Sequence, residues 1–385
     1  MLVDLIAGAR PNFMKIAPIT HAIRQAQLEG AGISFRIIHT GQHYDQNMSG
    51  SFFEQLGIPE PDHNLGAGGG TQAEQTAAIM TGYERLLMEG PRPDICIVVG
   101  DVTSTMACSI TARKLGIRVA HVEGGIRSRD WTMPEEINRV VTDSITDFFF
   151  TTSEVANRNL ASEGVPPDRI FFVGNTMIDT LHAQLPHLRE PGLISELGLQ
   201  KGRYFAMTLH RPANVDQEQT LKTLIENIMG STGGEPVIFP AHPRTRIILD
   251  RLGISHPGLH MTEPLGYLEF IWLVRHARAV ITDSGGITEE ATVLGVPCLT
   301  LRDNTERPET VTVGTNELIG TDPKAIAPAL KQLMNGKWKE GKVPEKWDGK
   351  TSGRIVSTLL VLHGSGRLAP LRPYRDDSLL FRPQE

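Results

Sequence analysis

The sequence predicts an α/β protein built from two Rossmann-like domains that face a central cleft. Its 385 residues, of which 40% are hydrophobic, can bury a large core and suffice for two domains of ordinary size. Short apolar runs rich in β-branched residues alternate with longer stretches of helical spacing, which is typical of parallel β-α-β units. This alternation stops near residue 175 and starts again at Tyr204. We therefore expect domains at residues 1–180 and 181–353, followed by a helix and tail at 354–385 that return to the first domain.

The first domain is expected to contain one doubly wound parallel sheet. Its strands are expected at residues 2–6, 35–38, 95–99, 118–122, 147–151 and 170–173. Helical spacing marks residues 12–26, 72–87, 104–115, 134–145 and 154–163. Ligands of such sheets bind outside the carboxyl ends of the strands, so we expect functional residues in the loops that follow them.

The second domain repeats the pattern with its own strands and helices. Strands are expected at residues 204–208, 236–239, 259–261, 279–281 and 298–301. Helices are expected at residues 217–229, 267–275, 288–294 and 323–334, with a final helix at 354–362. The segment 185–202 contains Pro186 and Pro191 and is expected to link the domains.

Composition argues against several classes of protein. The net charge is −6 and no basic block stands out, so non-specific binding of nucleic acid has no electrostatic basis. No run of about 18 apolar residues exists, and we expect a cytoplasmic protein without a membrane segment. The three cysteines follow no metal-ligand spacing and are expected to be buried free thiols.

The segment ITDSGGITEE is the most informative local pattern. Ser284, Gly285 and Gly286 follow an apolar run and open a helical stretch, so backbone N–H groups there can approach an anion closely. Glu290, one turn into that helix, could accept both hydroxyls of a ribose. An ordinary strand-to-helix turn explains Ser-Gly-Gly equally well when it is taken alone.

Polar residues also follow the strands of the first domain. Arg10 ends the first strand and could reach a phosphate, although a solvated turn cation is the commoner explanation. Asp101 and Glu123 follow the third and fourth expected strands, and Glu135 opens a helix at Pro134, where early acids also mark a plain helix start. Three carboxylates expected at one edge, without a metal motif, indicate acid/base groups whose pKa values differ through repulsion and burial.

The second domain offers histidines after its strands. His210 and Arg211 end its first strand, where histidine could titrate near neutrality, although a lone histidine is more often structural. His242 with Arg244 forms a weaker candidate pair. The loop that ends at Tyr267 could hold a planar base by stacking and backbone contacts.

Eleven ordered motifs resemble the UDP-N-acetylglucosamine 2-epimerase family of the non-hydrolysing type. The match runs from residue 3 to about residue 320, and its motifs read GARPNFMKIAP, TGQHYDQNM, VVGDVTST, HVEGGIRS, PEEINR, GNTMID, TLHRPAN, PAHPRT, PLGY, TDSGGITEEA and RDNTERPE. The resemblance implies the arrangement of two Rossmann domains called GT-B. It also implies that UDP-N-acetylglucosamine (UDP-GlcNAc) and UDP-N-acetylmannosamine (UDP-ManNAc) are interconverted by elimination of UDP to 2-acetamidoglucal and re-addition, as in the synthesis of cell-surface polysaccharides.

The resemblance assigns roles to the candidate residues. It implies acid/base work for Asp101, Glu123 and Glu135, and assistance to UDP departure by His210. The residues implied to bind substrate are Arg10, Arg211, Tyr267, Ser284, Gly285, Gly286 and Glu290. No cofactor, nicotinamide or catalytic metal is implied. The expected partner is a UDP-sugar, without nucleic acid or membrane, in a homodimer.

One segment departs from the family pattern. Allosterically activated members bind a second substrate molecule through a Gln-His loop and a nearby arginine; Gln42 and His43 match the loop, and His242 is a further candidate allosteric residue. The following segment, residues 66–72, contains no arginine. The open alternatives are therefore a 2-epimerase of another UDP-2-acetamido sugar, a hydrolysing epimerase that releases ManNAc and UDP, a GT-B glycosyltransferase and a non-catalytic nucleotide-sugar sensor.

Overall fold

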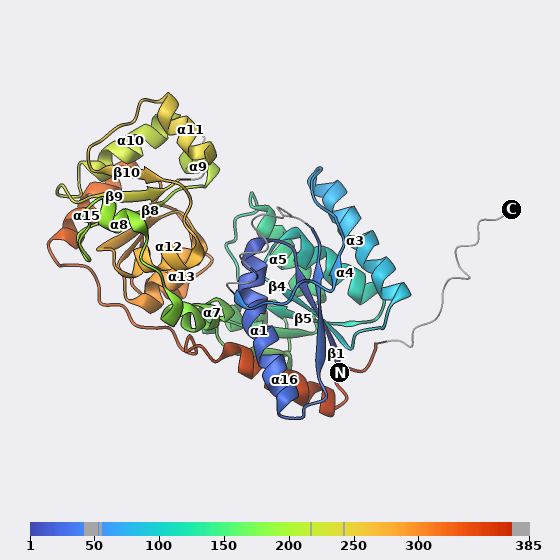
Figure 1. Cartoon of the computed structure of the whole chain (residues 1–385). Helices are drawn as coiled ribbons and strands as arrows, with labels where there is room; N and C mark the ends of the chain where they lie inside the picture. Colours follow the sequence, from blue (N-terminus) through green and yellow to red (C-terminus); the bar gives the residue numbers. More distant parts are fainter. Residues whose placement is uncertain (42–52, 54–55, 216–217, 242, 372–385) are drawn as a thin grey trace. The chain divides into compact units, whose positions relative to one another are not determined.

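The computed structural model describes residues 1–41, 53, 56–215, 218–241 and 243–371. The chain forms two compact units, each with its own parallel sheet (Figure 1). Unit 1 comprises Met1–Thr180 and the segment that begins at Asp348, and unit 2 comprises Leu181–Trp347. The predicted fold class, α/β with two Rossmann-like domains, is confirmed. Unit 2 ends at Trp347, whereas the sequence placed the boundary at residue 353.

Unit 1 is built on a seven-stranded parallel sheet with the order β3-β2-β1-β4-β5-β6-β7. The strands are β1 (Leu2–Ala7), β2 (Ser34–His39), β3 (His63–Asn64), β4 (Ile95–Val99), β5 (Arg118–Val122), β6 (Phe148–Thr151) and β7 (Ile170–Phe172). The strand order reverses between β1 and β4, which is where a doubly wound sheet opens a crevice for a ligand. Arg10, Asp101 and Glu123 follow the three strands β1, β4 and β5 around this point.

The helices of unit 1 begin at residues that suit a helix start. Thr71 forms a capping box with Glu74, Ser153 accepts from the Ala156 N–H, and Pro134 occupies a first-turn position. The helices are α1 (Arg10–Leu28), α3 (Gln72–Glu89), α4 (Thr103–Lys114), α5 (Pro134–Ile145), α6 (Glu154–Ser162), η1 (Pro167–Arg169) and α16 (Thr351–Gly364). Helix α7 (Thr176–Gln184) begins in unit 1 and ends in unit 2.

The last described helix, α16, packs against the first, α1, within unit 1 (Figure 1). Ile355 and Leu359 of α16 are fully buried. The buried Asp179 accepts hydrogen bonds from the N–H groups of Thr351 at 3.0 Å and Ser352 at 2.6 Å. A carboxylate on the first N–H groups of a helix satisfies orphan donors and complements the helix dipole. The chain therefore crosses back to unit 1 after completing unit 2.

Unit 2 has a six-stranded parallel sheet with the order β10-β9-β8-β11-β12-β13. The strands are β8 (Phe205–Thr208), β9 (Val237–Pro240), β10 (Leu259–Thr262), β11 (Ala279–Thr282), β12 (Cys298–Thr300) and β13 (Asn316–Leu318). The helices are η2 (Leu185–His187), α8 (Gly192–Glu196), α9 (Pro212–Val215), α10 (Glu218–Met229), α11 (Pro243–Arg251), α12 (Tyr267–Arg275), α13 (Gly285–Leu294), α14 (Pro308–Thr312), η3 (Pro323–Ala325) and α15 (Ile326–Met334).

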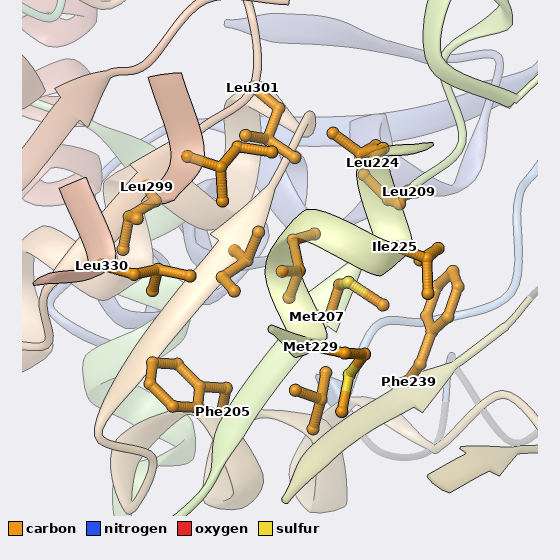
Figure 2. Packing of buried hydrophobic residues seen from close by; sticks show 14 of the residues in the cluster. Phe205, Met207, Leu209, Leu224, Ile225, Met229, Phe239, Leu299, Leu301 and Leu330 are labelled. Carbon is orange, nitrogen blue, oxygen red and sulfur yellow. The ribbon is translucent and has the colours of Figure 1, made fainter. Parts of the chain in front are cut away.

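The core of unit 2 fills both faces of this sheet. Figure 2 shows Met207 and Phe239 of the sheet packed against Leu224 and Met229 of α10. Ile194 of α8 is buried in the cluster on the other face. The segment 185–202, expected as a linker, is therefore part of unit 2, because its apolar side chains complete that core. No helix within the described ranges combines the length and apolarity that a bilayer crossing requires.

Candidate active site

Asp101 and Glu123 leave the sheet of unit 1 from neighbouring strands. Val99 at the end of β4 pairs with Val122 at the end of β5, so the residues that follow them emerge at the same level. The backbone turns at Gly100 with φ +68°, a conformation that glycine adopts without steric cost. The structure thus brings together the ends of the strands that carry these two predicted carboxylates.

Glu123 is held in an unusual conformation. It is buried and has φ +75°, in the left-handed region that side chains rarely adopt. Its Oε2 lies 2.7 Å from Nζ of Lys15 on α1. The next turn needs Gly125, where a Cβ would lie 2.6 Å from the carbonyl oxygen of Ala156. Strain of this kind persists only where the surroundings impose it, and it concentrates at functional sites.

A network of buried polar and charged side chains holds the turn that follows Glu123. Asp143 lies 2.6 Å from Nδ1 of His121 and 2.6 Å from a guanidinium nitrogen of Arg127, and it accepts the Gly125 N–H at 2.9 Å. Burial alone would raise the pKa of Asp143, but these contacts outweigh it and lower the pKa. Nε2 of His121 lies 2.7 Å from the Gly100 carbonyl, which can only accept. His121 therefore links the β4 turn to Asp143, which holds the β5 turn.

Asp101 is paired with a cation of its own. Arg139 of α5 donates to Oδ2 of Asp101 from Nη2 at 2.5 Å and from Nε at 3.1 Å, and Asn138 donates to its backbone carbonyl at 2.8 Å. The Asp101 side chain is 30% exposed, whereas that of Arg139 is 4% exposed. Asp101 and Glu123 thus each have a separate partner, Arg139 and Lys15. The negative charge of each carboxylate is therefore balanced by its own neighbouring cation, whereas the sequence indicated that the carboxylates would repel one another.

Glu135 and Glu136 lie side by side in the first turn of α5 but differ in environment. Glu135 is half-buried and Glu136 is buried. Glu136 accepts the backbone N–H groups of Ser128 and Arg129, each at 2.9 Å, and a bond from Arg139 at 2.8 Å. Burial would raise the pKa of Glu136, but these donors lower it below its usual value. Glu136 is therefore a structural carboxylate, whereas the predicted candidate Glu135 is half-buried.

Arg10 is the first residue of α1 and is exposed. The loop before it is fixed by Asn12, whose Oδ1 accepts the N–H groups of Gly8 and Ala9 at 3.0 and 2.9 Å. Nδ2 of Asn12 donates to the Val99 carbonyl at the end of β4. One buried amide therefore joins the loops after β1 and β4, the two strands at the reversal of strand order.

In unit 2, His210 lies beside a carboxylate that the sequence analysis did not single out. Thr208 of β8 pairs with Thr282 of β11, so Leu209 and Asp283 leave the sheet together. Nδ1 of His210 lies 2.9 Å from Oδ1 of Asp283. Asp283 also accepts the backbone N–H of Arg211 at 2.9 Å. His210 and Arg211 thus both lie at the strand-order reversal of this sheet, between β8 and β11.

The Ser-Gly-Gly segment forms the amino end of α13. Ser284 precedes the helix, and Gly285 and Gly286 are its first two residues, whereas the sequence placed the helix start at Thr288. A Cβ on Gly285 would lie 2.6 Å from Oε1 of Glu306, while a Cβ on Gly286 would meet nothing within 4 Å. The open side at Gly286 exposes the amino end of the helix, where N–H groups and the helix dipole favour an anion.

Glu306 lies next to this helix start with a cation of its own. Its Oε2 is 2.6 Å from Nη2 of Arg302. Burial would raise the pKa of Glu306, but the hydrogen bonds and charge of Arg302 lower it to about 2. The pair is ionised, and it fixes the loop after β12 against Gly285.

Glu290 is a buried carboxyl with an altered titration. Tyr267 Oη donates to its Oε1 at 2.9 Å. Burial, with a contribution from the charge of Glu289, outweighs this hydrogen bond and raises the pKa of Glu290 to about 7. Glu289 itself pairs with Arg307. Glu290 and Tyr267, predicted separately, thus form one hydrogen-bonded pair within unit 2.

Gln42, His43 and His242, the candidate allosteric residues, lie outside the described residues. The sequence pattern does not single out the supporting groups, namely Asn12, Lys15, His121, Glu136, Arg139, Asp143, Asp283, Arg302 and Glu306. Asp283 could have been found from its place directly before Ser284 in the same motif. Among the described residues, no group of three or more His, Cys, Asp or Glu side chains could hold a metal ion.

Known proteins are similar to this chain over most of its length. A family model described as UDP-N-acetylglucosamine 2-epimerase matches residues 26–360. The UDP-N-acetylglucosamine 2-epimerase of Methanocaldococcus jannaschii is 41% identical over 371 residues, which cover 93% of this chain and 99% of that protein. The UDP-2,3-diacetamido-2,3-dideoxy-D-glucuronate 2-epimerase of Pseudomonas aeruginosa is 38% identical over 366 residues, covering 94% and 100%. The crystal structure of the M. jannaschii enzyme in complex with UDP-GlcNAc and UDP has a TM-score of 0.81 at 41% identity, covering 94% of this chain and 100% of that one.

Proposed function

The chain belongs to the UDP-N-acetylglucosamine 2-epimerase family, and from this membership we propose that it interconverts UDP-GlcNAc and UDP-ManNAc by inverting carbon 2 of the sugar. It is an enzyme of nucleotide-sugar metabolism. The observation that carries the proposal is the pair of half-sites. Strand-end carboxylates lie in unit 1, and an open helix amino end with the hydrogen-bonded pair of Tyr267 and the buried Glu290 lies in unit 2.

The proton on carbon 2 of the sugar is not acidic, so a base cannot simply remove it. No carbonyl adjoins carbon 2 within the ring, so direct deprotonation has no resonance stabilisation. Elimination avoids this, because the C1–O bond breaks and leaves its electron pair on the β-phosphate oxygen while the carbon 2 proton moves to a base. UDP then adds back to the resulting 2-acetamidoglucal, and a proton is delivered to the opposite face. The site must therefore supply acid/base groups on two faces and stabilise a diphosphate leaving group.

We assign the proton transfers to unit 1. Asp101, Glu123 and Glu135 are the acid/base carboxylates. Arg139 and Lys15 lie within hydrogen-bonding distance of Asp101 and Glu123, and they orient these groups and lower the cost of their negative charge. The rigid turn at Glu123 reduces the reorganisation that the carboxylate needs before it reacts.

We assign the nucleotide to unit 2. The diphosphate binds at Ser284, Gly285 and Gly286, with Arg10 and Arg211 as cations, and the exposed His210 assists departure of UDP. Glu290 accepts the ribose hydroxyls, with Tyr267 as its neighbour. The uracil is proposed to lie along the loop at 264–270.

A second candidate differs only in the sugar. The Pseudomonas relative acts by its name on UDP-2,3-diacetamido-2,3-dideoxy-D-glucuronate, and its 38% identity is close to the 41% of the M. jannaschii enzyme. The same half-sites would serve that reaction, since the leaving group and the reacting carbon 2 are the same.

We further propose that the protein is a homodimer and that it is located in the cytoplasm. Sedimentation of the purified protein would test the first statement, and fractionation of cells would test the second.

The direct test is incubation with UDP-GlcNAc in deuterium oxide, followed by NMR. We expect deuterium at carbon 2 and a new manno isomer that is still attached to UDP. Free ManNAc with UDP would indicate a hydrolysing enzyme. Turnover of the diacetamido glucuronate alone would select the second candidate, and no change in any UDP-2-acetamido sugar would refute the proposal.

Variants then test the assigned carboxylates. Asp101→Asn and Glu123→Gln should lower kcat by on the order of 10²- to 10⁴-fold, because a general acid or base contributes about that much. UDP affinity, measured by calorimetry, should change little in either variant. Glu154→Gln provides a matched control, since Glu154 also follows a strand of this sheet but is exposed at the start of α6. Normal turnover by either Asp101→Asn or Glu123→Gln would refute the role given to that residue.

A further inference from the structure

Asp283 is the central contact of the loop that carries His210. It is 0% exposed and directly follows β11. Its Oδ1 lies 2.9 Å from Nδ1 of His210. Its Oδ2 accepts the N–H groups of His210 at 3.1 Å and Arg211 at 2.9 Å and a bond from Nδ2 of Asn214 at 3.0 Å. One buried carboxylate thus contacts both the ring and the backbone of the loop after β8.

The charge of this carboxylate is maintained by its donors. Burial alone would raise the pKa of Asp283. The contacts with His210, Asn214 and the Arg211 N–H outweigh that effect and hold the pKa below its usual value. Asp283 is therefore an ionised acceptor, and each nitrogen that faces it must donate a hydrogen bond.

This requirement fixes the protonation of the His210 ring. Because Asp283 can only accept, Nδ1 of His210 carries hydrogen. The His210 side chain is 56% exposed although Nδ1 faces a fully buried group, so the exposed edge of the ring carries Nε2. In the neutral ring Nε2 is then a bare acceptor, and in the cation it is an outward-facing donor beside a buried negative charge.

The position of Asp283 connects this ring to the anion cradle. It is followed at once by Ser284 and Gly285, where α13 begins. Arg211 Nε also donates to the Asp283 backbone carbonyl at 3.1 Å. The side chain that orients His210 therefore belongs to the same turn as the backbone that is to receive the diphosphate.

We propose that Asp283 is a positioning residue that fixes His210 as the Nδ1–H tautomer, so that Nε2 faces the departing diphosphate. The second half of this statement rests on the proposed function, and the first half does not. In the elimination, the electron pair of the C1–O bond stays on the β-phosphate oxygen and the carbon 2 proton passes to a carboxylate of unit 1. The Nε2–H group of the His210 cation donates a hydrogen bond to that oxygen without giving up its proton, and re-addition reverses these changes.

Replacement of Asp283 by asparagine should change the tautomer for a geometric reason. Three donors face Oδ2 and need an acceptor, so the amide oxygen of the variant takes that place. Its NH₂ group then faces Nδ1 of His210, which must become an acceptor. The ring proton moves to Nε2, so the neutral ring of the variant donates from Nε2, and no ionised carboxylate faces Nδ1.

Nitrogen NMR of the full chain labelled with ¹⁵N in its imidazole rings tests the first half. His210→Gln identifies the signals of His210. We expect Nδ1–H in the neutral ring of the wild type and a majority of Nε2–H in Asp283→Asn. Asn214→Ala is the control, because it removes one tether of the loop and leaves the His210–Asp283 contact, so its tautomer should match the wild type.

Turnover tests the second half. With the substrate that the deuterium experiment identifies, Asp283→Asn should lower kcat by about tenfold, because a neutral Nε2–H donates a weaker hydrogen bond to the departing oxygen than a charged one. KM should change less, and Asn214→Ala should lose less of kcat. An Nε2–H tautomer in the wild type, or an unchanged tautomer in Asp283→Asn, would overturn the proposal. If Asp283→Asn does not fold, the wild-type spectrum and Asp283→Glu, which keeps the carboxylate and should keep Nδ1–H, still decide the matter. The spectra need no substrate, so the tautomer result stands even if no UDP-sugar is converted.

Discussion

At the scale of single residues, we expect Glu290 to make nucleotide binding depend on pH. Its pKa is raised to about 7 by burial and by Glu289. Two ribose hydroxyls need acceptors, which the ionised carboxylate supplies best, so ligand binding should favour ionisation. UDP affinity should therefore be full above about pH 7 and fall as the pH drops below it, by at most tenfold per pH unit for one proton. Calorimetric titration of UDP between pH 5.5 and pH 8.5 measures this.

Glu290→Gln is the control for that titration, because it keeps the shape and removes the ionisation. UDP itself titrates near neutrality, so the informative quantity is the difference between the two affinity profiles. The effect of pH on the stability of the ligand-free fold has the opposite sign to its effect on UDP affinity. A carboxyl whose folded pKa exceeds the ordinary 4.5 stabilises the fold below that pH and loses this contribution as the pH rises to about 7. Without ligand, Glu290→Gln should thus be more stable than the wild type at pH 8, by up to roughly 3 kcal/mol. If the UDP affinities of the two proteins changed with pH in parallel, the proposed contact between Glu290 and the ribose would be contradicted.

At the scale of elements, the two glycines at the amino end of α13 differ in their surroundings. Gly285 packs against the Glu306 carboxylate, whereas Gly286 is exposed and open. Gly286→Ala should leave the fold intact, and it could add up to about 1 kcal/mol from helix propensity. The added methyl group would lie at the helix start that the diphosphate approaches, so UDP affinity should fall by about tenfold or more, the equivalent of one net hydrogen bond.

Thermal unfolding and UDP calorimetry on the same samples check the Gly286 prediction. Gly285→Ala is the comparison, because its Cβ would displace the Glu306 carboxylate and should lower stability as well as binding. Unchanged UDP affinity in Gly286→Ala would place the diphosphate elsewhere. A large loss of stability in that variant would mean that Gly286 serves the fold.

The same helix shows how far the sequence could predict elements. The bounds of β4, β5, α5 and α12 coincide with the predicted ones, because apolar runs or helix-start residues mark both ends. The start of α13 was placed three residues late, since two glycines read as a turn even though a first turn open to an anion favours them. The short strands β3 and β13 were missed because His63–Asn64 and Asn316–Leu318 carry polar residues at sheet edges.

The residues that orient the site were beyond the reach of a linear pattern. Lys15 lies 108 positions from Glu123 along the chain, and Asp283 lies 73 positions from His210. Each pair meets because parallel strands deliver distant loops to one edge of a sheet. A motif marks the group that reacts, while the group that holds it becomes visible only when the strand order is known.

At the scale of the whole molecule, the two units differ in how the chain builds them. Unit 1 needs the chain from both sides of unit 2, because α16 returns to pack against α1. Unit 2 is one continuous segment with its own sheet and core, and its last residue, Trp347, is fully buried. Every candidate nucleotide contact except Arg10 lies within unit 2. The fragment 176–347, which keeps α7 whole, should therefore fold and bind UDP without any epimerase activity.

The affinity of this fragment measures what unit 1 contributes to the nucleotide. Loss of the charged hydrogen bond from Arg10 should weaken UDP binding by about 10- to 100-fold relative to the whole chain. Circular dichroism establishes folding, calorimetry gives the dissociation constant, and Glu290→Ala in the same fragment should remove most of the remaining affinity. A folded fragment that binds no UDP would mean that the α13 cradle depends on unit 1. A fragment that binds as tightly as the whole chain would exclude Arg10 as a diphosphate ligand and leave unit 1 with the proton transfers alone.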